Sequence, residues 1–312
     1  MPTLLDYRRR IRSIKSTQQI TRAMKFVAAA KLRRAQAGVF AARPYAHEII
    51  RVLRSAAARM ETPAHPLLER RPEERILVVI LTGDRSLAGA FNANVIRRSI
   101  QFLREHASQK NEILVVGKKG RDTLRKRGWK FAAEYLNVSS GVDFARAKEI
   151  ADKIAELYTR EEVDAVYVIY NEFKNVMVQK LRVEKLLPID PAVVAQGTRD
   201  PQEGAEGRQD AESSLPRELS PSGKFLVDYI YEQPVEEIFA HLVPRYLESE
   251  VFRILLESSA AEHAARMTAM DSATRNASDL IDRLTLQMNK TRQAAITKEL
   301  IEIVSGAASA VS

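Results

Sequence analysis

The chain has 312 residues, of which 45% are hydrophobic and 6% aromatic, and it carries a formal net charge of +9. It is long enough for a buried core, but the absence of cysteine excludes disulfides, thiolate metal sites and thiol nucleophiles, and fits a reducing compartment. The longest apolar run, 76–81, is far shorter than the roughly 20 residues of a membrane-spanning helix, and no secretory signal follows Met1. We therefore expect an intracellular protein that meets a membrane only through partners.

The positive charge is concentrated near the N-terminus. Residues 1–60 contain fourteen Lys and Arg against Asp6 and Glu48, a net charge of +12, so the rest of the chain sums to −3. A stretch this basic requires an anionic partner, which could be nucleic acid, lipid headgroups or an acidic protein surface. Composition alone does not choose among the three.

The N-terminal segment predicts one long helix. Residues 3–39 are rich in Ala, Arg, Lys, Ile and Met, and Gly38 is their one helix breaker. We expect the helix to continue to about Met60, with an interruption near Pro44 left open. Its apolar residues recur at helical spacing without forming a clean heptad: Ile11, Ile14, Ile20, Met24, Val27 and Ala28.

The middle of the chain, 75–194, predicts an α/β domain. Short β-branched runs at 75–83, 112–117 and 164–173 resemble buried parallel strands, and 176–187 alternates as an edge strand does. Helical stretches lie at 88–106, 118–127 and 144–158. This alternation predicts a Rossmann-like βαβαβ unit with a mostly parallel sheet. Residues 195–223 are polar, charged and rich in Gly and Pro, and we expect a flexible acidic insertion there.

A second long helix is expected within the C-terminal segment, 224–312. Residues 245–305 contain neither Gly nor Pro, enough for a helix of about 90 Å. Candidate seam residues recur there at alternating spacings of three and four, as in a coiled coil. A helix in the core of a bundle is the alternative explanation of this pattern. The residues at these positions are Met267, Met270, Thr274, Ala277, Ile281, Leu284, Met288, Thr291 and Ala295.

Catalytic, cofactor-binding and metal-binding motifs are missing from the sequence. The loop 82–92 follows a strand as a phosphate loop would, but it lacks the G-x-x-x-x-G-K-[ST] pattern, and Asp84 would repel a phosphate. The loop at 116–120 lacks the third glycine of a dinucleotide fingerprint. The five histidines are scattered, with no zinc-type pair. We expect a chain that is not itself an enzyme and that holds no cofactor.

The C-terminal segment 289–309 resembles the signature of bacterial-type ATP synthase gamma subunits. That signature, I-T-x-E-x-x-E followed by G-A, corresponds to Ile296, Thr297, Glu299, Glu302, Gly306 and Ala307. Segments 12–35, 82–92, 228–234 and 248–270 extend the resemblance along the chain. It implies that the two terminal helices pair as an antiparallel coiled coil, with the α/β domain between them and the chain termini together.

The resemblance also implies a function and partners. Gamma subunits form the central stalk of a proton- or sodium-translocating ATP synthase, at the cytoplasmic face of the inner membrane. They rotate within three alpha and three beta subunits, and their foot contacts the epsilon subunit and the membrane c-subunit ring. On this basis Met24, Arg22 and Lys25 face the acidic levers of beta, and Arg292, Gln293 and Thr297 make contacts near the top of the shaft. The residues that match the foot are Tyr229, Tyr231 and Glu232.

Two other interpretations remain at this stage. A basic coiled coil that binds nucleic acid would explain the +12 of residues 1–60 but not the C-terminal signature. An α/β enzyme with helical arms would need a ligand site in the central domain. The insertion 195–223 lies where chloroplast gamma subunits carry a cysteine switch; without cysteine, thiol regulation is excluded here, and an acidic brake is a hypothesis.

Overall fold

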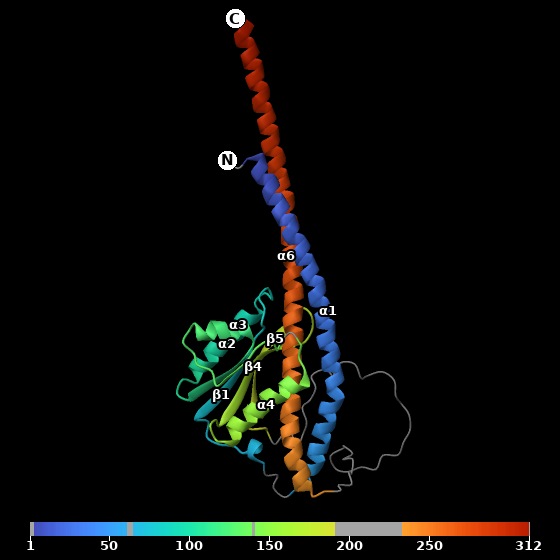
Figure 1. Ribbon diagram of the computed structural model, residues 1–312, viewed down its shortest axis with the longest axis vertical. Helices are drawn as coiled ribbons and strands as arrows, with labels where there is room; N and C mark the ends of the chain where they lie inside the picture. Colours follow the sequence, from blue (N-terminus) through green and yellow to red (C-terminus); the bar gives the residue numbers. More distant parts are fainter. Residues whose placement is uncertain (1–2, 61–64, 139–140, 191–232, 312) are drawn as a thin grey trace, which may run out of the picture.

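The computed structural model describes residues 3–60, 65–138, 141–190 and 233–311. The expected insertion at 195–223 therefore lies outside the described residues. Two long helices dominate the shape, and an α/β domain lies against one side of them (Figure 1). Within the described segments, none of the helices combines the length and the hydropathy that crossing a bilayer requires.

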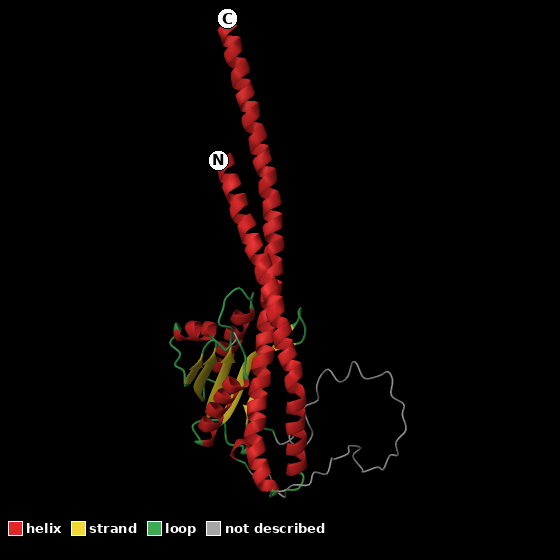
Figure 2. Cartoon of the chain, turned by 45° about the vertical axis from the view of Figure 1, so that its right-hand side comes forward, coloured by secondary structure: helices red, strands yellow, loops and turns green. Residues whose placement is uncertain are grey.

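The two long helices run antiparallel. Helix α1 spans Leu4–Ala57 and helix α6 spans Val235–Val311, so their lengths are about 80 Å and 115 Å. Both ends of the chain lie at the same end of the molecule, and α6 continues well past the start of α1 (Figures 1 and 2). The structure therefore confirms the antiparallel two-helix coiled coil.

A capping box begins α1: Thr3 Oγ1 accepts from Asp6 N at 3.3 Å, and Asp6 Oδ2 accepts from Thr3 N at 3.0 Å. The sequence leaves open whether the first helix is interrupted near Pro44. The structure has no interruption there, because α1 continues through Pro44. Pro44 faces solvent, while Ile49 and Leu53, about one and a half and two and a half turns later, are buried in the core and hold the helix in place. Similarly, α6 continues through Pro244, so it begins before the stretch 245–305 that lacks Gly and Pro, and inside the predicted segment 224–312.

The seam of α1 is a regular heptad, contrary to the sequence interpretation. Alternating steps of three and four residues along α1 lead from Leu4 to Ala56, and every residue in this three-four series is buried or half-buried. Ile20 and Val27, which the predicted stripe includes, lie outside this series and are 57% and 58% exposed. The periodicity was hidden because the series contains Gln18, Thr21 and Lys25 in place of apolar residues. On α6, all nine predicted seam residues are buried or half-buried, as expected.

The α/β domain contains one five-stranded sheet of order β3-β2-β1-β4-β5. The strands are β1 Arg75–Leu81, β2 Lys110–Val116, β3 Ala133–Tyr135, β4 Ala165–Phe173 and β5 Gln179–Leu187. All neighbours pair in parallel except β4 and β5, so β5 is an antiparallel edge strand. The predicted mostly parallel sheet is therefore confirmed, but β3 was missed because three residues without an apolar run give no strand pattern.

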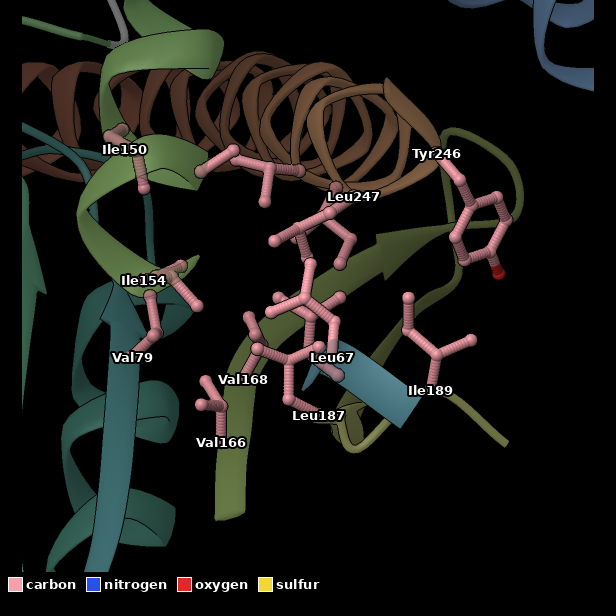
Figure 3. Close-up of a cluster of buried hydrophobic side chains, with 14 of the residues drawn as sticks. Leu67, Val79, Ile150, Ile154, Val166, Val168, Leu187, Ile189, Tyr246 and Leu247 are labelled. Carbon is pink, nitrogen blue, oxygen red and sulfur yellow. The ribbon is translucent and has the colours of Figure 1, made fainter. Parts of the chain in front are cut away.

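Helices cover both faces of the sheet. Alternate side chains of β1 point to opposite faces, so Leu77 and Val79 pack toward α4 (Phe144–Thr159) and α6, while Ile76 and Val78 pack toward the other two helices. Those two are α2 (Phe91–Glu105) and α3 (Lys118–Arg125), and a short 3-10 helix spans Pro66–Leu68. Figure 3 shows the first cluster, with Val79, Val166 and Val168 of the sheet near Ile150 and Ile154 of α4 and Leu247 of α6. Helix α6 is thus both half of the coiled coil and part of the domain core.

The turn between β2 and α3 requires glycine. Gly117 has φ +97°, and a Cβ there would lie 2.0 Å from the carbonyl oxygen of Thr82. We predict that Gly117→Ala lowers the free energy of unfolding by about 3 kcal/mol or more, since it combines backbone strain with a clash. Gly128→Ala is the matched control: φ is +85°, but nothing lies within 4 Å of the added Cβ. It should cost about 1 kcal/mol. Urea unfolding of both variants measures the difference, and equal losses would contradict the steric explanation.

Candidate functional site

The upper half of the seam contains polar pairs. Thr21 Oγ1 and Thr274 Oγ1 are 2.8 Å apart, and Lys25 Nζ lies 2.5 Å from Asp271 Oδ1. Arg275 also reaches Asp271, at 2.6 Å. The hydrogen bond from Lys25 is the main cause that holds the pKa of Asp271 below its usual value. Because these pairs form in one alignment of the helices only, they fix the register of α1 on α6.

The three proposed contact residues of α1 have different surroundings. Arg22 is exposed, whereas Met24 and Lys25 are half-buried, and Lys25 is engaged by Asp271. Arg22 and Lys25 line a surface hollow of about 440 Å³. Phe26, which the sequence interpretation did not select, also lines the hollow and is 62% exposed. No sequence signal singles it out, because Phe40 and Tyr45 of the same helix are also exposed, at 61% and 51%.

The three proposed residues of α6 lie farther along the shaft. Arg292, Gln293 and Thr297 are all exposed. They begin about 27 Å beyond Thr274, which pairs with Thr21, so the two groups of contact residues do not form one site. Large apolar side chains nearby are also exposed, from Ile296 at 49% to Val304 at 68%. This projecting end of α6 has no α1 beside it (Figure 2).

The three residues assigned to the foot, Tyr229, Tyr231 and Glu232, lie outside the described residues. Their roles therefore stay predictions from the resemblance. The described part of the chain resumes with α6, at the end of the shaft opposite the termini (Figure 1).

The loop that could have held a phosphate is internally satisfied. At the N-terminus of α3, Lys118 N donates to Asp84 Oδ1 at 3.0 Å and Lys119 N donates to the carbonyl oxygen of Gly83 at 3.2 Å. Gly120 N donates to Thr82 Oγ1 at 2.9 Å. A carboxylate of the chain itself thus occupies the position that an anion would take, and no amide of this turn is left for a ligand.

The same loop attaches the α/β domain to the shaft. A Cβ on Gly83 would lie 2.7 Å from the Glu262 carboxyl carbon, so the loop backbone contacts α6 directly. Glu262 binds Arg266 at 2.6 Å, and Arg266 also donates to the carbonyl oxygen of Ser86. Burial, together with the positive charge of Arg266, lowers the pKa of His263 to about 4, so this histidine is neutral at pH 7.

Two further groups of charges hold the domain on α6. Glu248, only 4% exposed at its side chain, binds Lys148 of α4 at 2.8 Å. One turn and a half later, Arg253 lies at the centre of three carboxylates. They are Glu184 of β5 at 3.0 Å, Glu250 at 2.7 Å and Glu257 at 3.0 Å. This cluster adjoins a cavity of about 430 Å³ between α1, α6 and the edge of the sheet.

The arrangement offers no site for metal chemistry among the described residues, where no group of three or more potential metal ligands comes together. The described side chains hold two helices in register and fix a domain to one of them. The exposed residues near Arg22 and at the projecting end of α6 remain available for protein contacts.

Glu257 makes the stability of this junction depend on pH. Burial raises its pKa, and its Oε2 is buried without a hydrogen-bond partner. The folded protein therefore binds the proton more tightly than the unfolded chain, and stability falls as pH rises from about 4.3 through the raised pKa.

We predict that Glu257→Gln stabilises the protein above this range by about 1 kcal/mol and less at lower pH. Thermal unfolding between pH 4 and 8 measures it.

Glu156→Gln is the control, because the hydrogen bond from Lys153 lowers the pKa of Glu156. Its effect should have the opposite sign: a small loss of stability above pH 4.3 that disappears in acid. A Glu257→Gln variant with no pH-dependent gain would contradict this account of the junction.

Comparison with known proteins places this geometry in a family. A family model described as ATP synthase matches residues 3–310. The ATP synthase gamma chain of Solibacter usitatus is 48% identical over 314 residues, covering 99% of this chain and 100% of its own. That of Pelotomaculum thermopropionicum is 46% identical over 308 residues, covering 99% of both chains.

Solved structures show the same fold. A chain from the central stalk and c-ring structure of the Tetrahymena thermophila mitochondrial ATP synthase has 25% identity and a TM-score of 0.54, covering 81% of this chain and 99% of its own. A chain of the Euglena gracilis mitochondrial ATP synthase has 22% identity and a TM-score of 0.62, covering 98% and 94%. These relatives give the nucleic-acid-binding interpretation no support. The family match and the identities over nearly the whole length show that the chain belongs to the ATP synthase gamma chain family.

Proposed function

We propose that this chain transmits torque as the central shaft between a membrane rotor ring and a catalytic ring of three alpha and three beta subunits. As a gamma chain it is a non-catalytic rotor subunit of ATP synthase. The observation that carries the proposal is the antiparallel pair of helices, one of which projects alone beyond the other (Figure 2). A paired helix resists twisting more than a single one, and a single projecting helix is narrow enough to turn inside a ring of subunits.

The partners and location follow from the same proposal. The end of the shaft at which α6 begins would contact the epsilon subunit and the c-subunit ring, through Tyr229, Tyr231 and Glu232. The chain would then be peripheral, at the cytoplasmic face of the inner membrane, and coupled to the flow of protons or sodium ions. We divide it into the N-terminal helix at 1–60, the α/β domain at 75–194, the insertion at 195–223 and the C-terminal helix at 224–312.

Contacts with the catalytic ring are proposed at two levels. At the lower level, exposed Arg22 and the hollow beside Phe26 present positive charge and an aromatic ring, which suits an acidic lever. At the upper level, Arg292, Gln293 and Thr297 lie among exposed apolar side chains on the projecting helix. Met24 is half-buried beside the seam residue Lys25, so its contribution would be to place Arg22 and Lys25.

Reconstitution tests the function as a whole. The chain is mixed with alpha and beta subunits of its own enzyme, and a bead on the α/β domain reports movement during ATP hydrolysis. We expect a stoichiometric complex and rotation in steps of one third of a turn, as three equivalent catalytic sites require. A chain that assembles but stays still during hydrolysis would contradict the proposal.

The shaft should turn as one body. We predict that a disulfide between Thr21→Cys and Thr274→Cys, whose hydroxyls are 2.8 Å apart, leaves the hydrolysis rate of the assembled enzyme unchanged. The reason is that α1 and α6 need not move past each other during rotation. The same enzyme after reduction is the control. If the disulfide stops hydrolysis and reduction restores it, sliding within the seam is part of the cycle and the rigid shaft is wrong.

The lower contact should depend on the charge of Arg22. We predict that Arg22→Glu slows ATP hydrolysis by the assembled enzyme about three- to tenfold, because it turns attraction to an acidic lever into repulsion. Arg33→Glu is the matched control: Arg33 is also exposed on α1 and outside its seam. Neither change should alter thermal unfolding of the isolated chain. Equal rates in the two variants would remove Arg22 from the contact.

A further inference from the structure

The outer face of the α/β domain carries positive charge that the shaft does not use. Residues 91–130 contain eleven Lys and Arg against three Asp and Glu, a net charge of +8, although everything after residue 60 sums to −3. Seven of these cations make no ion pair with any described residue. Together they define the α2–α3 basic face: Arg97, Arg104, Lys118, Lys119, Lys126, Arg127 and Lys130.

The acidic side chains around this face are already engaged. Glu105 binds Arg98 at 2.9 Å, and Asp122 binds Arg121 at 2.7 Å. Glu134 of β3 binds Arg125. All three partners are arginines outside the seven. Lys118 and Lys119 are close enough to help lower the pKa of Asp122, but three carboxylates are too few to neutralise the face. Six of its seven side chains are exposed and Lys119 is half-buried. Their mutual repulsion is relieved only by counterions or by an anionic partner.

The face combines charge with an aromatic surface. Trp129 and Phe131 pack partly buried against the core beneath α2 and α3, and the Arg125 guanidinium lies 6.0 Å from the centre of the Phe131 ring. Lys126 and Lys130 flank Trp129 in the turn after α3. The first three amides of α3 are satisfied internally, as described above, so an anion would be recognised by these side chains rather than by the helix end.

We propose that the α2–α3 basic face is a docking surface for an acidic segment of a protein partner. This rests on the proposed function in one respect, the orientation of the shaft. Helix α3 lies at the edge of the domain nearer the chain termini, away from the end where α6 begins (Figure 1). A membrane at the foot would therefore not reach it, whereas a polypeptide beside the rotor would. Charge complementarity beside half-buried aromatic rings suits a segment that mixes Asp and Glu with apolar residues.

The chain supplies its own probe, because Trp129 is its one tryptophan. Fluorescence of the full-length protein is titrated with poly-glutamate, with phosphatidylglycerol vesicles and with single-stranded oligothymidylate. We expect poly-glutamate to change the Trp129 emission with an affinity that falls as salt rises. The variant Lys126→Glu with Lys130→Glu should bind about tenfold more weakly. The matched control is Lys174→Glu with Lys180→Glu, two exposed lysines on the β4–β5 hairpin, which should bind as the native chain does.

Each other outcome overturns the proposal. Equal affinities in the two double variants would mean that poly-glutamate binds elsewhere, for example along the basic α1. Vesicles or oligothymidylate that change the emission more effectively than poly-glutamate would assign the face to lipid or nucleic acid instead. In the assembled enzyme, a photo-crosslinker at Arg127 should capture a segment of net negative charge, and capture of a neutral or basic one contradicts the assignment. The titrations use the isolated chain, so a failure to bind poly-glutamate would not contradict the proposed rotary function. A failure of the assembled enzyme to rotate would likewise not change the result of the titrations.

Discussion

The antiparallel seam between α1 and α6 is the constraint on which the rest of the structure depends. Small side chains near its middle, such as Ala28 and Ala260, let the two helices approach closely, and both are almost fully buried. Higher up, the Thr21–Thr274 and Lys25–Asp271 pairs replace apolar contacts. Apolar packing alone tolerates a slip of one heptad, whereas these polar pairs are lost by it. In the seam, close apolar packing therefore holds the helices together, and the polar pairs nearer the chain termini fix their register.

The α/β domain depends on the same helix. Its loop at 82–91, its helix α4 and its edge strand β5 each contact α6 at a different height, through Gly83, Lys148 and Glu184 respectively. The carboxyl edge of a parallel sheet commonly binds ligands. Here Asp84, Gly83 and Thr82 accept from the first three α3 amides, and α6 covers the neighbouring loop. An edge suited to a nucleotide therefore serves as an attachment. A force on the domain therefore reaches α6 first and α1 through the seam.

Much of this fold could be predicted from the sequence, and the failures have physical causes. The long helices and the parallel strands followed from length without breakers and from β-branched runs. The α1 heptad was obscured because Lys25 and Thr21 sit in the seam, and their partners on α6 are more than 240 residues away. Only the paired structure shows why polar residues belong there. For the same reason the exposure of Ile20 and Phe26 and the internal use of Asp84 needed tertiary contacts to be seen.

The paired part of the shaft and the projecting end of α6 differ in what their side chains contact. Where α1 accompanies α6, buried side chains and polar pairs bind the helices to each other, and the outside mixes charged residues with single apolar ones such as Phe26 and Phe40. Beyond the start of α1, the remaining single helix exposes Leu300, Ile301 and Ile303, each more than half accessible. Isolated apolar side chains are common on protein surfaces, but a row of them on a lone helix is expected where a partner surrounds it. Apolar contact lacks direction, so such an end can turn against its surroundings, while the directional charges stay in the part that must not slip.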